Sequence, residues 1–469
     1  MSFWKNIYLH RKELIVLLVL KLAVVLYFNW QYQLYWPANQ QQGWAMLGND
    51  TSGYMRPLEA MVQGYGYDSV CRMPAFAPLY FVCYFIFGSA NVLSALVLFQ
   101  GFMSWISSVL IFLILKGNSV SNQRSLIGAS VFLIFPLIAT YDHLILSDSL
   151  GNSFFLVAIY LAWRAKQSNS NLLLFLASFF LVWSGFFRQI HFIFLPFLFW
   201  YAVPTWGSFS KVIIKKLLIF IFPFFVLVGS WAGYNKMRTN QWIYTVAPYE
   251  TCFGYLPKPL LELRKLMIAM GGDIQPWVKG SAGEFFIGKE ERVPFQEKQF
   301  TSNMKEPELK ELKRQYQNFY YRNDSLAGEF VIQKSNEYLE AYKSEHPSQF
   351  YFTNRLNLLV KFIFPNHVDN LPGPAIHEMN IFQKGMKAFA WVGMFLINAF
   401  AFICVFLSWR HARDWFVLAI ANVLLILILA CFFGWIELRY LLPIHSLSLL
   451  LIFIGTRSVQ FPWKKNNTP

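Results

Sequence analysis

The feature that most constrains this chain is a series of apolar stretches, each comparable in length to the thickness of a lipid bilayer. A membrane-spanning helix needs about 20 predominantly apolar residues. The candidate spans are 14–31, 89–115, 126–141, 149–163, 172–187, 190–204, 217–234, 386–408, 415–433 and 441–456. The sequence therefore predicts an all-α polytopic membrane protein with about ten transmembrane helices.

Composition agrees with this assignment and excludes several other classes of protein. The chain is 56% hydrophobic, 19% aromatic and only 14% charged, which rules out a disordered chain and a small disulfide scaffold. Its net charge of +15 would suggest a polyanionic partner in a soluble protein. Here the membrane explains the charge, because cytoplasmic loops collect Lys and Arg. We expect a lipid bilayer, and no nucleic acid, as a partner.

Loop charge also orients the spans. With the N-terminus inside, ten spans place fifteen basic residues and two acidic ones in the cytoplasm. The same count favours a short interfacial or re-entrant helix at 78–87 and a hairpin at 172–204, interrupted at Arg188, because the alternatives move basic clusters outside. We expect a multi-pass, monomeric protein of a bacterial inner membrane, with both termini cytoplasmic and the first span uncleaved.

Three parts follow from this topology. Residues 1–234 form an N-terminal membrane domain whose first outer loop is 32–88, and residues 383–469 form C-terminal membrane helices with a short cytoplasmic tail. Between them, 235–382 predicts a soluble, mainly helical extracytoplasmic domain, with eighteen basic and seventeen acidic residues. Amphipathic helices are expected at 307–321 and 327–343.

The cysteines indicate no metal site, because no CxxC or His/Cys spacing is present. Cys83, Cys404 and Cys431 fall in apolar stretches. Only Cys71 and Cys252 lie in segments predicted to be outside, where a disulfide between them is permitted.

The predicted cytoplasmic loops account for most of the excess of Lys and Arg over Asp and Glu. A few further ionisable residues are predicted to lie at the outer membrane face. Charges at this depth are costly and commonly line a cavity or a path. They are Asp50, Arg56, Glu59, Asp68, Arg72, Asp142, Asp148, Arg188, Glu437 and Arg439.

Each of these residues also has a simpler explanation, which the sequence leaves open. Asp50 could be merely the N-cap of a helix at 51–63, and Asp148 could be merely the cap of the fourth span. Arg188 could anchor a hairpin turn, and Arg439 could pair with Glu437.

Two further polar residues accompany them. Lys21 lies inside the first span, where it reaches either a helix partner or a lipid path. His143, beside Asp142, is either a ligand or an interfacial histidine.

Several motifs occur in an order that resembles a known family. Asp50-x-x-x-Tyr54 is followed by Gly64-Tyr-Gly66 and by Arg72-Met-Pro74-Ala-Phe-Ala-Pro78. Leu146-Ser-Asp148 begins the fourth span, Tyr234 to Asn240 opens the large loop, and Glu437-Leu-Arg439-Tyr440-Leu-Leu-Pro443 precedes the last span. Together they resemble the GT-C superfamily of integral-membrane glycosyltransferases, in its protein O-mannosyltransferase-like and aminoarabinose-transferase-like branch. Many relatives have an acidic pair where this chain has Asp50-Thr51, which leaves metal dependence open.

The resemblance implies transfer of a sugar from a polyprenyl-phosphate donor to a glycan, lipid or protein acceptor. Such a donor needs no Gly-rich nucleotide loop, and none is present. Asp50 is then expected to take the acceptor's proton, with inversion at the anomeric carbon. Asp148 is expected to hold the acceptor or to share a divalent cation with Asp50.

The remaining candidates are assigned to the two substrates. Arg72, Arg188 and Arg439 are expected to bind the donor phosphate, for which a forked guanidinium is suited. Tyr54, Arg56, Glu437 and Tyr440 are candidate substrate contacts. No nucleotide or organic cofactor is expected.

Two other functions remain as alternatives. A polysaccharide polymerase or ligase of the cell envelope also has about ten to twelve spans, but concentrates its functional charges in a late loop. A lipid-linked-glycan transporter or flippase would be expected to show inverted repeats and charges near the midplane. The charges here gather at one face.

Overall fold

The computed structural model describes residues 8–48, 50–203, 211–247, 257–271, 285–288, 291–363, 377–429 and 438–457. This part of the chain is helical except for one antiparallel pair of two-residue strands, β1 (Gln41–Gln42) and β2 (Ala45–Met46). The all-α prediction is therefore confirmed. The chain divides into two compact units, which are described separately.

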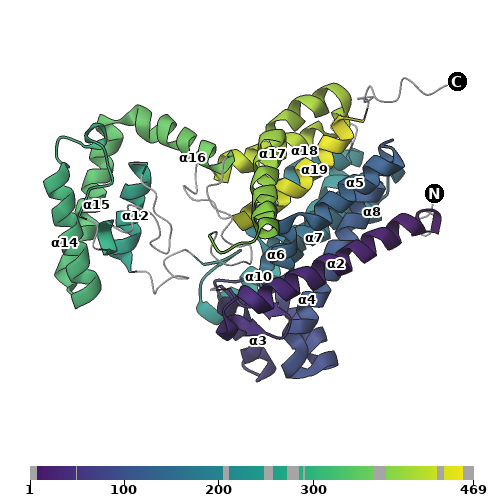
Figure 1. Ribbon diagram of the computed structural model, residues 1–469, viewed down its shortest axis with the longest axis horizontal. Helices are drawn as coiled ribbons and strands as arrows, with labels where there is room; N and C mark the ends of the chain where they lie inside the picture. Colours follow the sequence, from purple (N-terminus) through teal and green to yellow (C-terminus); the bar gives the residue numbers. More distant parts are fainter. Residues whose placement is uncertain are drawn as a thin grey trace. The chain divides into compact units, whose positions relative to one another are not determined.

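Unit 1 comprises Met1–Val246, Pro365–Leu425 and Glu437–Pro469. Figure 1 shows its helices α5, α6, α7 and α19 packed together beside α2 and α4. Its described helices are α2 (Arg11–Tyr35), η1 (Ala38–Gln40), α3 (Thr51–Val62), η2 (Pro74–Phe76), α4 (Ala77–Gly117), α5 (Asn122–Ile134), α6 (Pro136–His143), α7 (Ser147–Ser168), α8 (Asn171–Phe187), η3 (Gln189–Ile193), α9 (Phe194–Ala202), α10 (Lys211–Thr239), α17 (Ile381–His411), η6 (Arg413–Trp415), α18 (Phe416–Ile428), η8 (Leu438–Leu441) and α19 (Leu442–Gly455).

Four helices in the described residues are long and apolar enough to cross a membrane, namely Arg11–Tyr35, Pro74–Gly117, Lys211–Thr239 and Ile381–His411. The bent pair α5 and α6 adds a fifth if it is counted as one span. Shorter apolar helices cover Asn171–Phe187, Gln189–Ala202 and Arg439–Gly455. Several membrane-spanning helices are therefore supported by length and composition.

The structure changes or refines three predicted features of the spans. The stretch 126–141 was expected as one helix, but Pro136 divides it into α5 and α6, which meet at 49°, because proline interrupts the helical hydrogen bonds. The segment 77–87 is helical and separate from 89–117, since Gly88 has φ 74° inside α4. Arg188 leaves the helix at the end of α8, which confirms the break within 172–204.

Loops predicted to face the cytoplasm contact one another. Lys166 pairs with Asp414 at 3.0 Å, and Arg124 donates to the Thr456 carbonyl oxygen at 3.0 Å. Trp415 donates to Asn118 at 2.9 Å. These contacts place the ends of α4, α7 and α19 and the segment after α17 close together at one end of the helices.

A buried ion pair ties α2 to the junction between α6 and α7. Lys21 of α2 pairs with Asp142, and both side chains are almost fully buried. Ser104 of α4 donates to Asp142 at 2.6 Å, and Ser149 of α7 also donates to it. Gln100 of α4 donates to the Asp142 carbonyl oxygen at 2.8 Å. Lys21 thus has a helix partner, and Asp142, expected among the outer-face charges, is instead enclosed in the helix core.

Substituting Lys21 by Met is expected to destabilise unit 1 by about 3–5 kcal/mol, because it strands the Asp142 carboxylate in an apolar core. The loss of stability would be measured as a lower midpoint of thermal unfolding in detergent. The double variant Lys21→Met/Asp142→Asn should recover most of the loss, since the amide oxygen still accepts from the two serines. Equal instability of single and double variants would contradict a pairing role.

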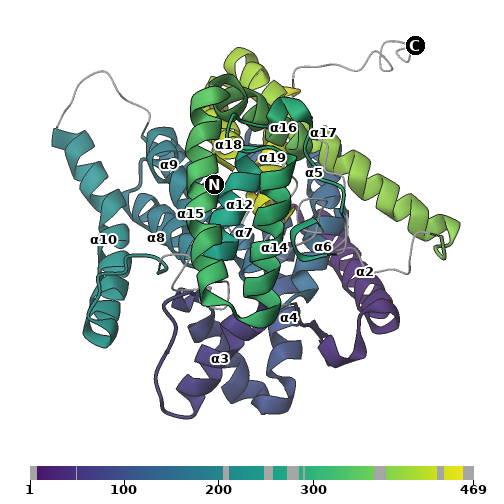
Figure 2. The same cartoon turned by 90° about the vertical axis from the view of Figure 1, so that its left-hand side faces the viewer.

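Unit 2 comprises Ala247–Phe364 and Ile426–Ile436. Figure 2 shows α12 (Lys258–Ala269), α14 (Glu306–Arg322) and α15 (Ser325–Glu345) side by side. The other helices described there are η4 (Glu297–Gln299), η5 (Gln349–Thr353) and α16 (Asn354–Ile363). The two amphipathic helices predicted at 307–321 and 327–343 are confirmed as α14 and α15.

The core of unit 2 is a cluster of leucine and aromatic side chains. Leu266, Phe285, Leu309, Tyr316 and Tyr342 are all fully buried in it. The turn between α14 and α15 uses Asn323 at φ 54°, and the Asp324 side chain then caps α15 by accepting from Ala327 N at 3.1 Å.

The start of this compact region differs from the predicted 235–382. Residues 235–246 belong to unit 1. Those after α10, 240–246, pack back on the end of that helix, because Asn235 donates to the Ile243 carbonyl oxygen at 3.0 Å and Trp231 donates to that of Thr245 at 2.7 Å.

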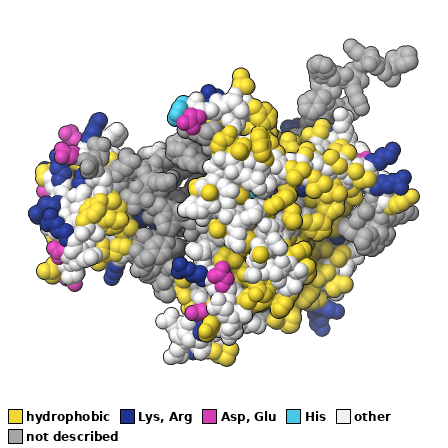
Figure 3. All heavy atoms as spheres, turned by 60° about the horizontal axis from the view of Figure 1, so that its bottom comes forward, with side chains coloured by type: hydrophobic (Ala, Val, Ile, Leu, Met, Phe, Trp, Pro, Cys, Tyr) yellow, Lys and Arg dark blue, Asp and Glu magenta, His cyan; other side chains and the backbone are white. Residues whose placement is uncertain are grey.

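The surface chemistry follows these assignments. Figure 3 shows hydrophobic side chains covering much of one face of unit 1, whereas Lys, Arg, Asp and Glu are mixed on unit 2. Exposed apolar side chains recur along α2, including Leu22, Leu26 and Trp30. A row of this kind on one helix is suited to contact with lipid.

Candidate active site

The loop at 32–88, predicted to be the first outer loop, docks against the junction between α6 and α7. Ile145 N donates to the Met46 carbonyl oxygen at 3.1 Å. Thr51 Oγ1 donates to the Ile145 carbonyl oxygen at 3.2 Å and accepts from Gly48 N at 2.8 Å. These bonds place the start of α3, and with it Asp50, beside the start of α7, where Asp148 lies.

Asp50 occupies the N-cap position of α3 but its side chain does not cap the helix. Its two carboxylate oxygens instead bind two arginines, Arg439 at 2.6 Å and Arg72 at 3.3 Å. The capping explanation for Asp50 is therefore not supported. A carboxylate held by two guanidinium groups, 15% exposed, is shielded yet open to a small reactant.

Asp148 forms the second ion pair of the site. Its Oδ2 accepts from Arg188 at 2.6 Å, and its side chain is 1% exposed. Asp148 lies in the first turn of α7, whose N-cap is Leu146, so it is not the cap of that helix. Its burial behind Arg188 favours a role in orienting this arginine over direct contact with an acceptor.

Arg188 reaches Asp148 because the chain leaves the helical conformation there. At the end of α8 its backbone is extended, with φ −144° and ψ 110°. The side chain, 15% exposed, therefore turns into the cluster. Arg188 is thus paired within the cluster and does more than anchor a turn.

Arg72 is positioned by the second half of the first outer loop. The Tyr67 hydroxyl donates to the Arg72 carbonyl oxygen at 3.0 Å, and Ser69 Oγ accepts from Arg72 N at 3.1 Å. Tyr234 and Arg238 of α10 in turn donate to the Tyr67 carbonyl oxygen, at 2.9 and 3.0 Å. The residues that open the large loop therefore support the site without entering it.

Aromatic rings lie against the arginines. The Arg72 guanidinium lies 4.7 Å from the centre of the Tyr54 ring. The guanidinium groups of Arg188 and Arg439 lie 5.5 and 5.7 Å from the centre of the Tyr440 ring. Such contacts with an aromatic face favour the charged guanidinium.

Tyr54 was expected to contact substrate, but it is 6% exposed. Its hydroxyl forms a hydrogen bond with Ser147 Oγ at 2.7 Å. Tyr54 therefore braces Arg72 and joins α3 to α7. Ser147 was not singled out from the sequence, and its position next to Asp148 was the only available signal.

Several positive charges meet in the cluster. Among the described residues, three arginines, Arg72, Arg188 and Arg439, meet two carboxylates, Asp50 and Asp148. Among the described residues, the buried Nε atoms of Arg72 and Arg188 have no hydrogen-bond partner. Three guanidinium groups that meet at one partly exposed place fit an anionic ligand with several oxygen atoms, such as a phosphate.

The pKa of Asp50 follows from the same geometry. Burial by itself would raise it, but the positive charges of Arg439 and Arg72 outweigh burial and hold the pKa below its usual range. Asp50 is therefore ionised throughout the neutral range. Its folded-state pKa lies below that of the unfolded chain, so its stabilising contribution is lost only as the pH falls through the lowered value.

The carboxylates of the cluster do not fit a divalent cation. The described residues contain no group of three or more His, Cys, Asp or Glu side chains arranged to hold a metal. Asp50 and Asp148 are each engaged by arginine, whereas Mg²⁺ and Ca²⁺ are held by oxygen ligands free of competing cations. A shared cation is therefore not part of our proposal.

Three other candidates are not among the residues that the structure shows in the cluster. Arg56 is on the exposed face of α3, opposite the buried Tyr54 and Leu58, so the structure does not bring it to the site. Glu437 lies outside the described residues. The ring nitrogens of His143 lie 3.0 and 3.2 Å from the carbonyl oxygens of Ala139 and Val25, which leaves this buried histidine in the helix core.

Cysteine pairing near the site can be described in part. Cys71, next to Arg72, is disulfide-bonded, and Cys83 and Cys404 are free. Cys252, its predicted partner, lies outside the described residues. The disulfide constrains the loop that carries Arg72.

Comparison with known proteins finds no matching family model and no matching curated protein.

Proposed function

We propose that this protein is a glycosyltransferase that moves a sugar from a polyprenyl-phosphate donor to an acceptor at the outer face of a bacterial inner membrane. The observation that carries the proposal is the convergence of Asp50, Arg72, Asp148, Arg188 and Arg439 from separate parts of the chain into one partly exposed cluster. The order of motifs supports a GT-C-like architecture with about ten spans.

The arrangement suits a reaction in which a phosphate departs. The acceptor hydroxyl attacks the anomeric carbon, a new carbon–oxygen bond forms, and the bond from that carbon to the phosphate oxygen breaks. The electron pair goes to the polyprenyl phosphate, whose charge Arg439, Arg72 and Arg188 stabilise. In-line attack inverts the anomeric configuration.

The acceptor's proton goes to Asp50. In the resting site its lowered pKa makes Asp50 a weak base. A bound phosphate would compete for Arg72 and Arg439, which relieves their hold on the carboxylate and raises its basicity. The base would then be activated by the donor itself, which discourages proton abstraction before the donor is bound.

This arrangement predicts an unusual pH profile. Because the pKa of Asp50 is lowered, kcat/KM for the donor should show no acid limb from this group between pH 7 and about pH 5. Arg72→Gln removes one of the two charges that lower the pKa, so its acid limb should move to higher pH. Identical acid limbs for the two proteins would contradict the electrostatic role of Arg72.

The direct test is a transfer assay with purified full-length protein in detergent and radiolabelled polyprenyl-phosphate sugars. Binding of at least one donor, with release of polyprenyl phosphate when a suitable acceptor is present, is the expected result. Failure to bind any polyprenyl-phosphate sugar would count against the proposal and favour a polymerase or a transporter.

A further inference from the structure

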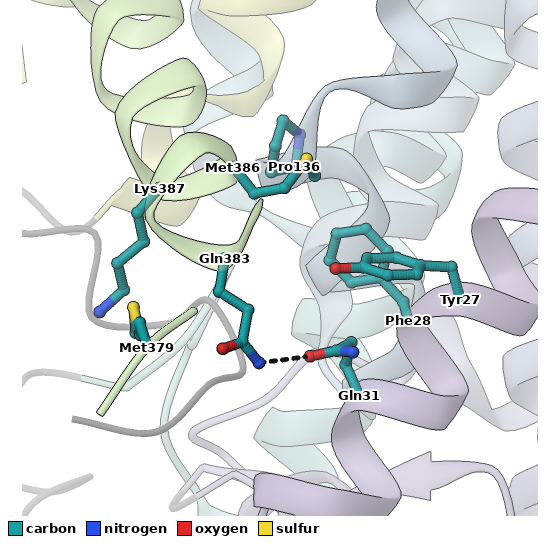
Figure 4. A pocket seen from close by; sticks show the side chains of 8 residues that line it. All are labelled: Tyr27, Phe28, Gln31, Pro136, Met379, Gln383, Met386 and Lys387. Atoms are coloured by element: carbon teal, nitrogen blue, oxygen red, sulfur yellow. Dashed lines mark hydrogen bonds between the residues drawn. The ribbon is translucent and has the colours of Figure 1, made fainter. Parts of the chain in front are cut away.

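A small pocket lies apart from the arginine cluster, between α2, the start of α6 and the start of α17. Figure 4 shows the side chains that line it. They are Tyr27, Phe28, Gln31, Pro136, Met379, Gln383, Met386 and Lys387. Because all of them belong to unit 1, the pocket is defined within one compact unit.

The walls of the pocket are apolar. Tyr27 and Phe28 present aromatic rings from α2, while Met386 of α17, Pro136 of α6 and Met379, which precedes α17, complete the walls. Flexible methionines and aromatic rings accommodate hydrocarbon chains of varied shape. Residues next to the pocket, such as Leu26 and Phe382, are exposed, so an apolar chain leaving it would continue along apolar surface.

Two side chains of the pocket, Gln31 and Lys387, have N–H groups for which the described residues offer no acceptor. Gln383 Nε2 donates to Gln31 Oε1 at 3.4 Å and to the Tyr35 hydroxyl at 3.1 Å, and its Oε1 accepts from Asn380 N at 3.1 Å. Gln383 is therefore fully engaged. The amide N–H groups of Gln31 have no acceptor among the described residues, and neither has the half-buried ammonium of Lys387.

The depth of the pocket narrows the choice of ligand. Tyr27 and Gln31 lie in the last turns of α2, and Lys387 lies in the second turn of α17. Both helices are candidate membrane spans, and in the predicted topology these ends are at the outer face. Phosphate head groups and the first methylenes of lipid chains occupy this depth.

We propose that this pocket binds an anionic phospholipid of the outer leaflet. The Lys387 ammonium holds the phosphate, and the Tyr27, Phe28 and Met386 side chains contact the start of an acyl chain. The donor phosphate is a poorer occupant, because the three arginines that suit it lie on other elements. The lipid site does not rest on the proposed transfer reaction.

The test measures lipid binding to delipidated full-length protein by native mass spectrometry, with phosphatidylglycerol, phosphatidylcholine and polyprenyl phosphate as probes. Phosphatidylglycerol should bind at least about fivefold more tightly than zwitterionic phosphatidylcholine, since only the former has a net negative charge. Lys387→Gln should weaken phosphatidylglycerol binding about tenfold. Lys384→Gln is the matched control, because Lys384 is exposed and does not line the pocket.

A second variant distinguishes loss of lipid binding from loss of folding. In Gln31→Glu one carboxylate oxygen can still accept from Gln383, while the other replaces the free N–H groups with negative charge. It should weaken phosphatidylglycerol binding at least as much as Lys387→Gln, with an unchanged midpoint of thermal unfolding. Equal losses in Lys384→Gln and Lys387→Gln, no loss in either pocket variant, or displacement of phosphatidylglycerol by polyprenyl phosphate at these residues would overturn the proposal.

Discussion

Asp50→Asn is expected to lower the rate of sugar transfer by about a hundredfold to ten-thousandfold, the range typical of a lost general base. Asparagine has nearly the same shape, and its Oδ1 can still accept from Arg439, which now binds Asp50 at 2.6 Å. What it cannot do is take a proton from the acceptor. The initial rate with a saturating polyprenyl-phosphate donor measures the effect.

A control in the same loop separates catalysis from folding. Glu59 lies on the exposed face of α3, so Glu59→Gln makes the same chemical change away from the cluster and should retain nearly full activity. Thermal unfolding in detergent should show both variants folded. Full turnover by Asp50→Asn would remove Asp50 from the mechanism.

Arg439→Ala should weaken binding of the donor by about tenfold to a hundredfold, because a hydrogen bond to a charged group contributes about 1.5–3 kcal/mol. Arg439 is 12% exposed and already holds one carboxylate oxygen of Asp50. Its planar group can engage a phosphate and Asp50 at the same time. Equilibrium binding of a polyprenyl-phosphate sugar would measure the loss.

Lysine provides a graded version of this test. Arg439→Lys keeps the charge but loses the fork of N–H groups, so donor affinity should fall between those of the native protein and the alanine variant. Arg410→Ala removes an equivalent charge from the exposed end of α17 and should leave donor binding unchanged. Unchanged affinity in Arg439→Ala would argue against a phosphate role.

Much of the helical architecture was predictable because the signals are local. Hydrophobic runs identify helices without knowledge of their partners, and the interruption at Arg188 and the two amphipathic helices of unit 2 were visible in the same way. The bend at Pro136 was not predicted, although proline was its signal, since a helix can also continue through proline with a kink.

The candidate site was predictable as a set of residues but not as a set of contacts. Asp50, Arg72 and Arg439 were chosen because charges at a membrane face are costly. Arg56 met the same criterion and points away on α3. Asp142 also met it, and pairs with Lys21 in the helix core. Distance along a sequence does not reveal which of these charges shares a neighbour.

Local sequence therefore determined the all-α class, the candidate membrane helices and the chemical types available at one face, because each depends on the hydrophobicity or charge of a short segment. Only the tertiary structure decided that Asp50 binds Arg72 and Arg439 and that Asp148 binds Arg188. Those pairings depend on the docking of the first loop against Ile145. They also depend on the packing of helices that are far apart in the sequence. The convergence of these charged groups, on which the proposed function rests, exists only in the folded protein.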